Sequence, residues 1–221
     1  MVGFGLPLGF LLLAPPNAAW DPRAPLDLAG PWTPVAEWKL RRALGDPALC
    51  RAALAPHAAA PPIADRVDSD VCHIRGGVRL SRLARAALDP VDTRCTVALR
   101  LFMWERESLQ PAARELLGAE VAEIEHFSSY SCRTIRTGRG PSTWMSQHAT
   151  ASAIDISGFR LDDGRRITLL ADWQGETPEA AFLRRAQDGL CDRFRIVLGP
   201  EHNALHADHF HADLSRWSFC R

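Results

Sequence analysis

Apolar residues recur at helical spacing in the first half of the chain and once more near its end. Residues 35–44 (VAEWKLRRAL) and 47–54 (PALCRAAL) each place apolar side chains three or four positions apart, which predicts two short helices. Residues 95–119 predict two further helices with a break near Pro111. The strongest helical pattern covers residues 177–194, whose apolar stripe indicates a core-facing helix. That segment opens with residues suited to a first helical turn, Thr177, Pro178 and Glu179.

Alternating apolar and polar residues predict strands at residues 71–80, 121–131, 195–199 and 209–214. The first of these contains a Gly-Gly pair and is expected to form a strand, a turn and a second strand. Residues 153–161 and 165–173 flank an Asp-Gly pair and predict a hairpin. The resulting fold class is α+β, with N-terminal helices packed on a small antiparallel sheet that carries the polar motifs.

The N-terminal end differs in composition from the rest of the chain. Its first 14 residues are apolar and uncharged, which is short for a membrane span but suits the apolar core of a secretion signal. We therefore assign residues 1–19 to a signal or membrane-anchor segment, with a buried helix as the alternative. Residues 20–34 are rich in proline and predict a stiff, exposed connector, so the domain is expected over residues 35–221.

Six cysteines support an exported protein. None forms a Cys-x-x-Cys pair, so a thiolate zinc cluster is not expected. An even number of widely spaced cysteines behind an apolar leader predicts three disulfides in an oxidising compartment, although the spacing does not choose the pairing and six buried thiols are the alternative. The expected location is periplasmic or extracellular, with possible anchoring in the inner membrane. Formal net charge is zero, which argues against a nucleic-acid partner.

Two polar clusters carry the candidate chemistry. In SQHATASAIDI, His148 and Asp155 lie seven positions apart, and a turn through the small residues between them would let both bind one ion. Residues 202–213 (HNALHADHFHAD) hold four of the eight histidines, and in a strand His209, His211 and Asp213 share one face. His148, Asp155 and one histidine of this pair would give two nitrogens and one carboxylate oxygen, which leaves a fourth zinc position open for water.

These motifs resemble known families. The pattern S-x-H-x6-D followed by H-x-H resembles the zinc peptidases that cut peptidoglycan peptides, such as D-alanyl-D-alanine carboxypeptidases and murein endopeptidases. More closely, the chain resembles the bacterial extensin-like C-terminal domain family from about Pro25 to Arg221. The matching pieces are APLDL, the C-x-x-x-L at Cys50, SYSCR, SQHATASAIDISGF, FLRRAQDGLC, VLGPEHNALHADHFHADL and the terminal CR.

The zinc-peptidase resemblance implies a role for each matching residue. His148, Asp155 and His211 match the three zinc ligands, and Ser146 matches the serine that orients the ligand segment. His209 would contact the substrate or the transition-state oxyanion. Asp208 falls where the carboxypeptidases carry a glutamate base, but its side chain is shorter. Either Asp208 transfers the proton itself, or His206 or His209 shares the proton transfer.

A further catalytic residue, Arg133, and two supporting residues, Tyr130 and Asp213, complete the prediction. Arg133 in SYSCR resembles an arginine that binds a terminal carboxylate or polarises the scissile carbonyl, with a surface salt bridge as the alternative. Tyr130 lines the site or packs against its surroundings, and Asp213 orients a ligand histidine. The expected function is an exported zinc-dependent hydrolase of peptidoglycan peptides, of carboxypeptidase or endopeptidase type. The alternatives are a zinc-containing module that binds peptidoglycan without cutting it, and a disulfide scaffold without metal.

Overall fold

The computed structural model describes residues 18–137 and 140–221. Several of its helices begin directly after a residue whose side chain caps them. Thr33 accepts a hydrogen bond from the backbone of Ala36 at the start of α1. Thr177 accepts one from the backbone of Ala180 at the start of α6, and this cap was predicted from the sequence. The helical segments are α1 (Pro34–Gly45), α2 (Pro47–Leu54), α3 (Cys95–Trp104), η1 (Glu105–Leu109), α4 (Gln110–Leu117), η2 (Gln147–Thr150), α5 (Leu169–Asp172), α6 (Pro178–Cys191) and η3 (Ala204–His206).

The predicted break near Pro111 is wrong. One π-helical turn, η1, joins α3 to α4, so helical backbone runs from Cys95 to Leu117. Pro111 lies in the first turn of α4, directly after the π-helical turn. The buried carboxylate of Glu105, in η1, accepts hydrogen bonds from the backbone N–H groups of residues 84–86.

The sheet is larger than predicted and mixed in direction. Seven strands follow the order β12-β10-β11-β8-β5-β4-β3, and β9 pairs with β8. The pairs β10–β12 and β4–β5 are parallel, and the other pairs are antiparallel. The strands of this sheet are β3 (Gly77–Arg82), β4 (Ala87–Arg94), β5 (Val121–His126), β8 (Ala153–Leu161), β9 (Arg166–Thr168), β10 (Ile196–Leu198), β11 (Phe210–Asp213) and β12 (Phe219–Cys220).

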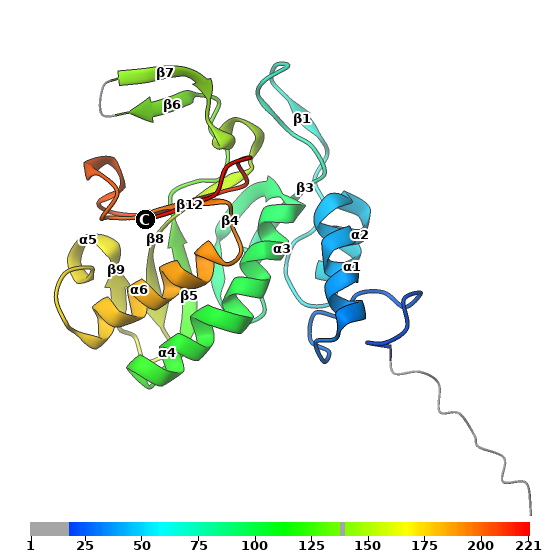
Figure 1. The fold of residues 1–221 in the computed structure, drawn as a ribbon, viewed down its shortest axis with the longest axis horizontal. Coiled ribbons are helices and arrows are strands. Elements are labelled where there is room, and N and C mark those ends of the chain that lie inside the picture. Colours follow the sequence, from blue (N-terminus) through cyan, green and yellow to red (C-terminus); the bar gives the residue numbers. More distant parts are fainter. Residues whose placement is uncertain (1–17, 138–139) are drawn as a thin grey trace, which may run out of the picture.

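Two small hairpins stand outside this sheet, above one end of it (Figure 1). One joins β1 (Arg66–Val67) to β2 (His73–Ile74), and the other joins β6 (Thr134–Thr137) to β7 (Gly140–Met145). The prediction of strand, turn and strand over residues 71–80 gave the elements but not their partners, because β2 pairs with β1 and β3 pairs with β4. The predicted hairpin around Asp163 and Gly164 is confirmed by the pairing of β8 with β9.

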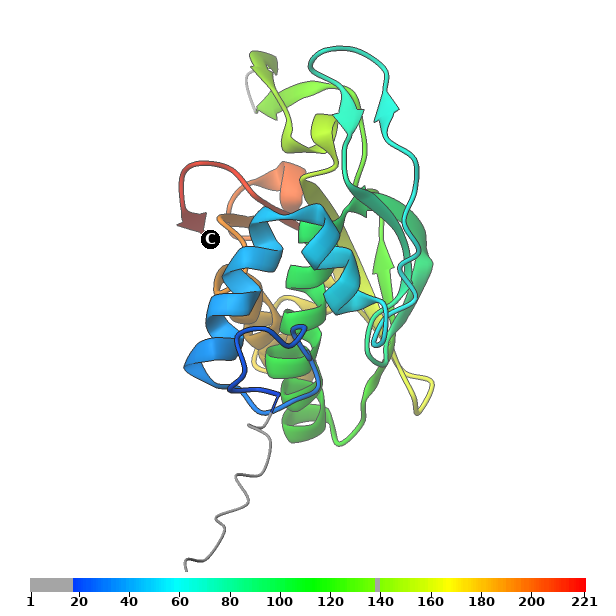
Figure 2. The ribbon, with the colours of Figure 1, turned by 90° about the vertical axis from the view of Figure 1, so that its right-hand side faces the viewer.

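Helices cover one face of the sheet, and the opposite face carries the polar motifs. In the side view, α3, α4 and α6 lie against the strands while α1 and α2 lie farther out (Figure 2). The N-terminal helices therefore pack mainly on α3 rather than on the sheet as predicted. Between helices and sheet, the buried ring of Phe159 lies 6.2 Å from Trp104 and 5.2 Å from Phe182, measured between ring centroids.

The segment before α1 is irregular, but it is not wholly exposed. Leu28 is fully buried against the helices, and Thr33 donates a hydrogen bond to the carbonyl of Ala19. The prediction of an exposed connector is thus wrong for part of residues 20–34. Residues 1–17, which carry most of the expected leader, lie outside the described residues. In the part of the chain that the structure describes, no helix has the length and apolar character needed to cross a membrane.

All six cysteines form disulfides, as predicted. Cys50–Cys95 ties α2 to the start of α3, and Cys191–Cys220 ties the end of α6 to β12. Cys72–Cys132 joins the β1–β2 hairpin to the segment that leads into β6. The fold is therefore a cross-linked α+β domain whose polar sheet face is flanked by the β6–β7 hairpin.

Candidate metal centre

Two neighbouring strands bring Asp155 and His211 together. Asp155 on β8 is the direct antiparallel partner of His211 on β11, so their side chains rise side by side from the sheet. Their sequence neighbours Ile154 and Phe210 are buried in the core, which forces the polar side chains to the opposite face. The alternation seen in the sequence thus sets the direction of both groups.

His148 reaches the same point from the short 3-10 turn η2. The backbone N–H of His148 donates to the hydroxyl of Ser146, which caps this turn. Ala151 adopts a left-handed conformation with φ of 48°, and the chain there reverses into β8. The turn predicted between His148 and Asp155 is therefore present.

The three side chains form a compact triangle. His148 Nε2 lies 3.1 Å from Asp155 Oδ1 and 3.1 Å from His211 Nδ1, and the last two atoms are 2.9 Å apart. Ligands about 2.0 Å from a tetrahedral zinc ion lie ~3.3 Å from one another. The triangle is close to that size, and this group could hold a metal ion.

Outward hydrogen bonds fix the tautomer of each imidazole. His148 Nδ1 faces the carbonyl of Ser129 at 3.1 Å, and His211 Nε2 faces Asp213 Oδ2 at 3.0 Å. Both partners only accept, so each outer nitrogen donates its N–H and each inner nitrogen presents a lone pair. Two nitrogen lone pairs and one carboxylate oxygen therefore converge on one point, an arrangement that could hold a cation between them.

In the metal-free chain, a proton on His211 supplies positive charge in place of a metal ion. Burial disfavours the charged form of Asp155, but hydrogen bonds from His148 and His211 outweigh burial and hold its pKa well below the usual range. Burial also opposes a charge on His211, yet its hydrogen bonds to Asp155 and Asp213 raise its pKa to about 9. The centre is thus built to hold positive charge.

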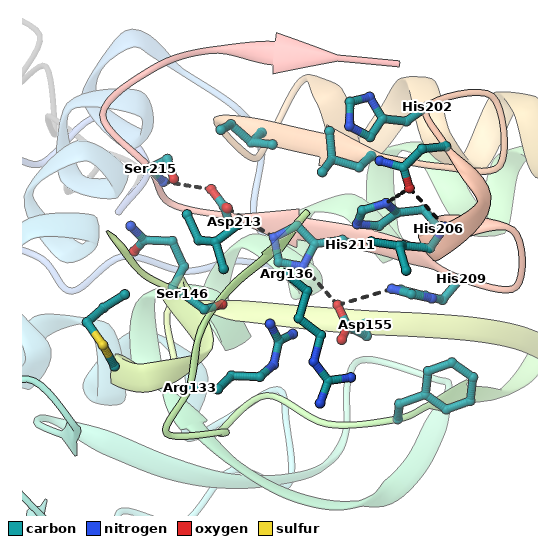
Figure 3. Close-up of a pocket in the computed structure, with 18 residues that line it drawn as sticks. Arg133, Arg136, Ser146, Asp155, His202, His206, His209, His211, Asp213 and Ser215 are labelled. Atoms are coloured by element: carbon teal, nitrogen blue, oxygen red, sulfur yellow. Dashed lines mark hydrogen bonds and ion pairs between the residues drawn. The ribbon is translucent and has the colours of Figure 1, made fainter. Parts of the chain in front are cut away.

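A cavity of about 530 Å³ opens in front of the triangle. Of the predicted site residues, Arg133, Ser146, Asp155, His206, His209, His211 and Asp213 line it. Figure 3 shows these side chains gathered from β8, β11, the segment before β11, the segment before β6 and the start of η2. Burial and the neighbouring His209, His211 and His202 lower the pKa of His206 to about 4, and its Nδ1 donates to Asn203 at 2.9 Å.

His209 and Asp208 form a pair rather than two separate groups. His209 Nδ1 lies 2.8 Å from Asp208 Oδ1, while its Nε2 lies 3.8 Å from Asp155 Oδ1 and faces the cavity. The carboxylate of Asp208 is 47% exposed and does not line the cavity. Asp208 is therefore placed to orient His209 and to leave the lone pair of Nε2 pointing at the site.

Arg133 and Tyr130 take different positions. Arg133 lines the cavity and makes no ion pair within the described ranges, so its salt-bridge alternative finds no support there. Tyr130 lies outside the cavity; its hydroxyl donates to Asp68 at 2.6 Å, and the guanidinium of Arg66 stacks on its ring at 4.6 Å. These contacts agree better with Tyr130 packing against its surroundings than with Tyr130 lining the site.

The sequence analysis missed three groups around the centre. Ser129 acts through its backbone carbonyl, which no side-chain pattern reveals. Phe127 presents its ring edge to His209, with the centroids 5.5 Å apart. Arg136 lines the cavity from β6, a strand that the alternation of apolar residues did not predict.

Comparison with known proteins identifies a family for most of the chain. No curated protein and no solved structure matches it significantly. A family model described as Extensin-like protein C-terminus matches residues 48–221, which include all three residues of the triangle and all six cysteines. The chain therefore belongs to the extensin-like protein C-terminus family.

Proposed function

We propose that this protein is an exported zinc-dependent hydrolase that cuts an amide bond in peptidoglycan peptides. One observation carries the proposal: three lone-pair donors converge beside a cavity that also holds the free nitrogen of His209. Two imidazoles and one carboxylate form a ligand set typical of hydrolytic zinc sites, which keep one position open. The resemblance of both motifs to the zinc peptidases supports the choice of substrate.

His148, Asp155 and His211 would hold the ion. When bound, zinc supplies Lewis acidity, which polarises a carbonyl group and makes water acidic near neutral pH. His209 Nε2 accepts the proton of the attacking water and later returns it to the leaving amine, because Asp208 holds the ring in the tautomer with a free Nε2. Arg133 binds a substrate carboxylate or the carbonyl oxygen from the wall of the cavity.

A second candidate is a zinc-containing module that binds peptidoglycan peptides without cutting them. The position of Asp208 favours it, because the carboxylate at the place of the usual base points away from the cavity. Among the described residues, only Asp155 and Asp213 contribute carboxylates to the lining, and both are engaged with His211. Hydrolysis therefore depends on His209.

The test uses the oxidised chain loaded with zinc. Bound zinc is measured for the wild type, His148→Ala and His209→Ala, with His126→Ala as a control histidine outside the cavity. Crosslinked muropeptides and a peptide ending in D-alanyl-D-alanine serve as substrates, and released amines are identified by mass spectrometry. We expect about one zinc per chain, lost in His148→Ala and kept in His209→Ala, and a rate reduction of about 10²–10⁴-fold in His209→Ala.

The outcomes separate the candidates. Zinc and peptide binding without any released amine in the wild type would support the binding module. A chain that takes up no zinc even from excess, while folding normally, would overturn both candidates together.

A further inference from the structure

Two arginines line the same wall of the cavity. Arg133 precedes β6 and Arg136 lies within it, and Figure 3 shows both side chains on the side of the cavity opposite His202 and His206. Neither forms an ion pair within the described part of the chain. Several exposed arginines of the main sheet are paired instead, such as Arg79 with Asp92 and Arg166 with Glu125.

An irregularity in the hairpin directs Arg136 into the cavity. The pairing of β6 with β7 shifts register between Thr134 and Arg136, and a bulge of this kind breaks the alternation of side chains. As a result, the consecutive residues Ile135 and Arg136 both line the cavity. Ile135 is 43% exposed there, although a large aliphatic side chain gains by burial. An apolar surface and a cation therefore lie next to each other.

The carboxylates of the cavity do not neutralise these arginines. Asp155 is hydrogen-bonded to His148 and His211, and Asp213 accepts from His211 and from the backbone of Ser215. A divalent ion held by the triangle would add further positive charge. The cavity then matches a ligand that carries more than one negative group.

We propose that Arg136 binds a side-chain carboxylate of the substrate, with Ile135 contacting the aliphatic stem of that side chain. The substrate is then a peptide with an acidic residue near the scissile amide, in addition to the carboxylate or carbonyl that Arg133 contacts. This inference rests on the proposed function, because it assigns the substrate of that same cavity. It makes Arg136 a specificity-determining residue and assigns it no part in proton transfer.

The test compares two peptides that differ by one charge. Both end in D-alanyl-D-alanine; one carries glutamate immediately before this pair and the other carries glutamine. Equilibrium binding to the zinc-loaded His209→Ala protein is measured by calorimetry, and kcat and KM are measured with the otherwise unaltered chain. Both measurements are repeated after adding Arg136→Gln. They are also repeated after adding Arg41→Gln, a matched control on the exposed side of α1.

We expect the glutamate peptide to bind roughly tenfold more tightly than the glutamine peptide, since one charge-assisted contact is worth that much at a partly exposed site. Arg136→Gln should abolish this difference by raising KM for the glutamate peptide, with kcat and the glutamine peptide unchanged. Arg41→Gln should leave both peptides as they are.

The two proposals fail separately. Hydrolysis of both peptides with equal KM would overturn the inference and leave the proposed function standing, with Arg136 as a solvated surface side chain. Discrimination in binding without any hydrolysis would sustain the inference and sink the hydrolase. Failure of the zinc-loaded protein to bind either peptide would overturn the inference.

Discussion

His148 and His211 hold the same kind of inner lone pair, but their outer partners differ. The outer nitrogen of His148 donates to a neutral carbonyl, whereas that of His211 donates to the carboxylate of Asp213. A carboxylate makes the imidazole more basic and a stronger ligand. The contribution of His211 to metal affinity therefore depends on a residue that does not touch the ion.

Replacing Asp213 tests this dependence. Asp213→Asn keeps the shape and the accepting oxygen but removes the charge, so we expect zinc to bind about 10- to 100-fold more weakly. Competition with a chromogenic chelator measures the change. Asp163→Asn, in the turn between β8 and β9, is the control, because that carboxylate contacts only Arg165. An unchanged zinc affinity in Asp213→Asn would show that the carboxylate charge is immaterial.

Metal binding should also depend on pH. In the metal-free chain the pKa of His211 is about 9 instead of 6.5, so its proton stabilises the fold fully below pH 6.5 and this stabilisation is lost as the pH rises through 9. Zinc must displace this proton, so its apparent affinity should increase with pH up to about 9. Calorimetry at pH 7.5 in buffers of different ionisation enthalpy should detect about one proton released per zinc. Equal binding heats in all buffers would contradict this.

At the scale of single residues, the sequence predicts the candidate metal ligands better than the groups that orient them. His148, Asp155 and His211 can be found because their side chains themselves provide the donor atoms. The support from Ser129 comes from a carbonyl that any residue could supply. The orientation of Asp208 depends on the backbone before β11, which the sequence does not reveal.

Among the elements, the continuous helix from α3 to α4 shows how a buried charge can fix local geometry. Glu105 is fully buried in the π-helical turn, where its carboxylate accepts from the backbone of Ala84, Arg85 and Ala86 and from Gln110. These bonds attach the turn between β3 and β4 to the helix. The π-helical turn therefore has a tertiary cause.

Truncating this side chain should be costly. Glu105→Ala leaves three backbone donors without their acceptor, and we expect the free energy of unfolding to fall by roughly 2–3 kcal/mol. Denaturant unfolding measures the loss. Glu115→Ala, on the exposed side of α4, should change the same quantity by less than about 1 kcal/mol, since its ion pair with Arg185 lies in solvent. Equal effects of the two substitutions would refute the role of Glu105.

This helix also shows what the sequence could predict at the scale of elements. The starts of α1 and α6 depend on Thr33 and Thr177, whose capping bonds are local and readable. The helical course through Pro111 depends on Glu105 reaching a distant turn, so a local pattern suggested a break instead. Strand β4 was missed because its polar residues and Pro90 do not alternate with apolar ones.

At the scale of the whole molecule, the fold positions the candidate metal centre without an ion. The triangle is positioned by hydrogen bonds to Ser129 and Asp213 and by the pairing of β8 with β11, none of which needs an ion. In the sheet, β11 lies between β8 and β10. This order brings together segments that are distant in the sequence, and the alternation of apolar and polar residues does not show which strands pair. Sequence patterns therefore gave the fold class but neither the size nor the mixed direction of the sheet.

Removal of metal should accordingly leave the protein folded. With excess EDTA we expect a cooperative thermal transition and unchanged far-ultraviolet circular dichroism, since the site is preformed. Zinc at about 100 times its dissociation constant should stabilise the fold by about 2.7 kcal/mol and raise the melting temperature. Loss of cooperative unfolding in EDTA would show instead that the ion is structural.

The pairing of the cysteines has a consequence for how this protein is made. Cys50 pairs with Cys95 and Cys72 with Cys132, so the two loops interlock along the chain, whereas Cys191 pairs with the next cysteine, Cys220. A chain oxidised from its N-terminus as it emerges would first join Cys50 to Cys72, which is a non-native bond. A chain oxidised in this order reaches the native pairing only by reshuffling, and we expect the yield of native protein to rise with an added disulfide isomerase more than with a stronger oxidant.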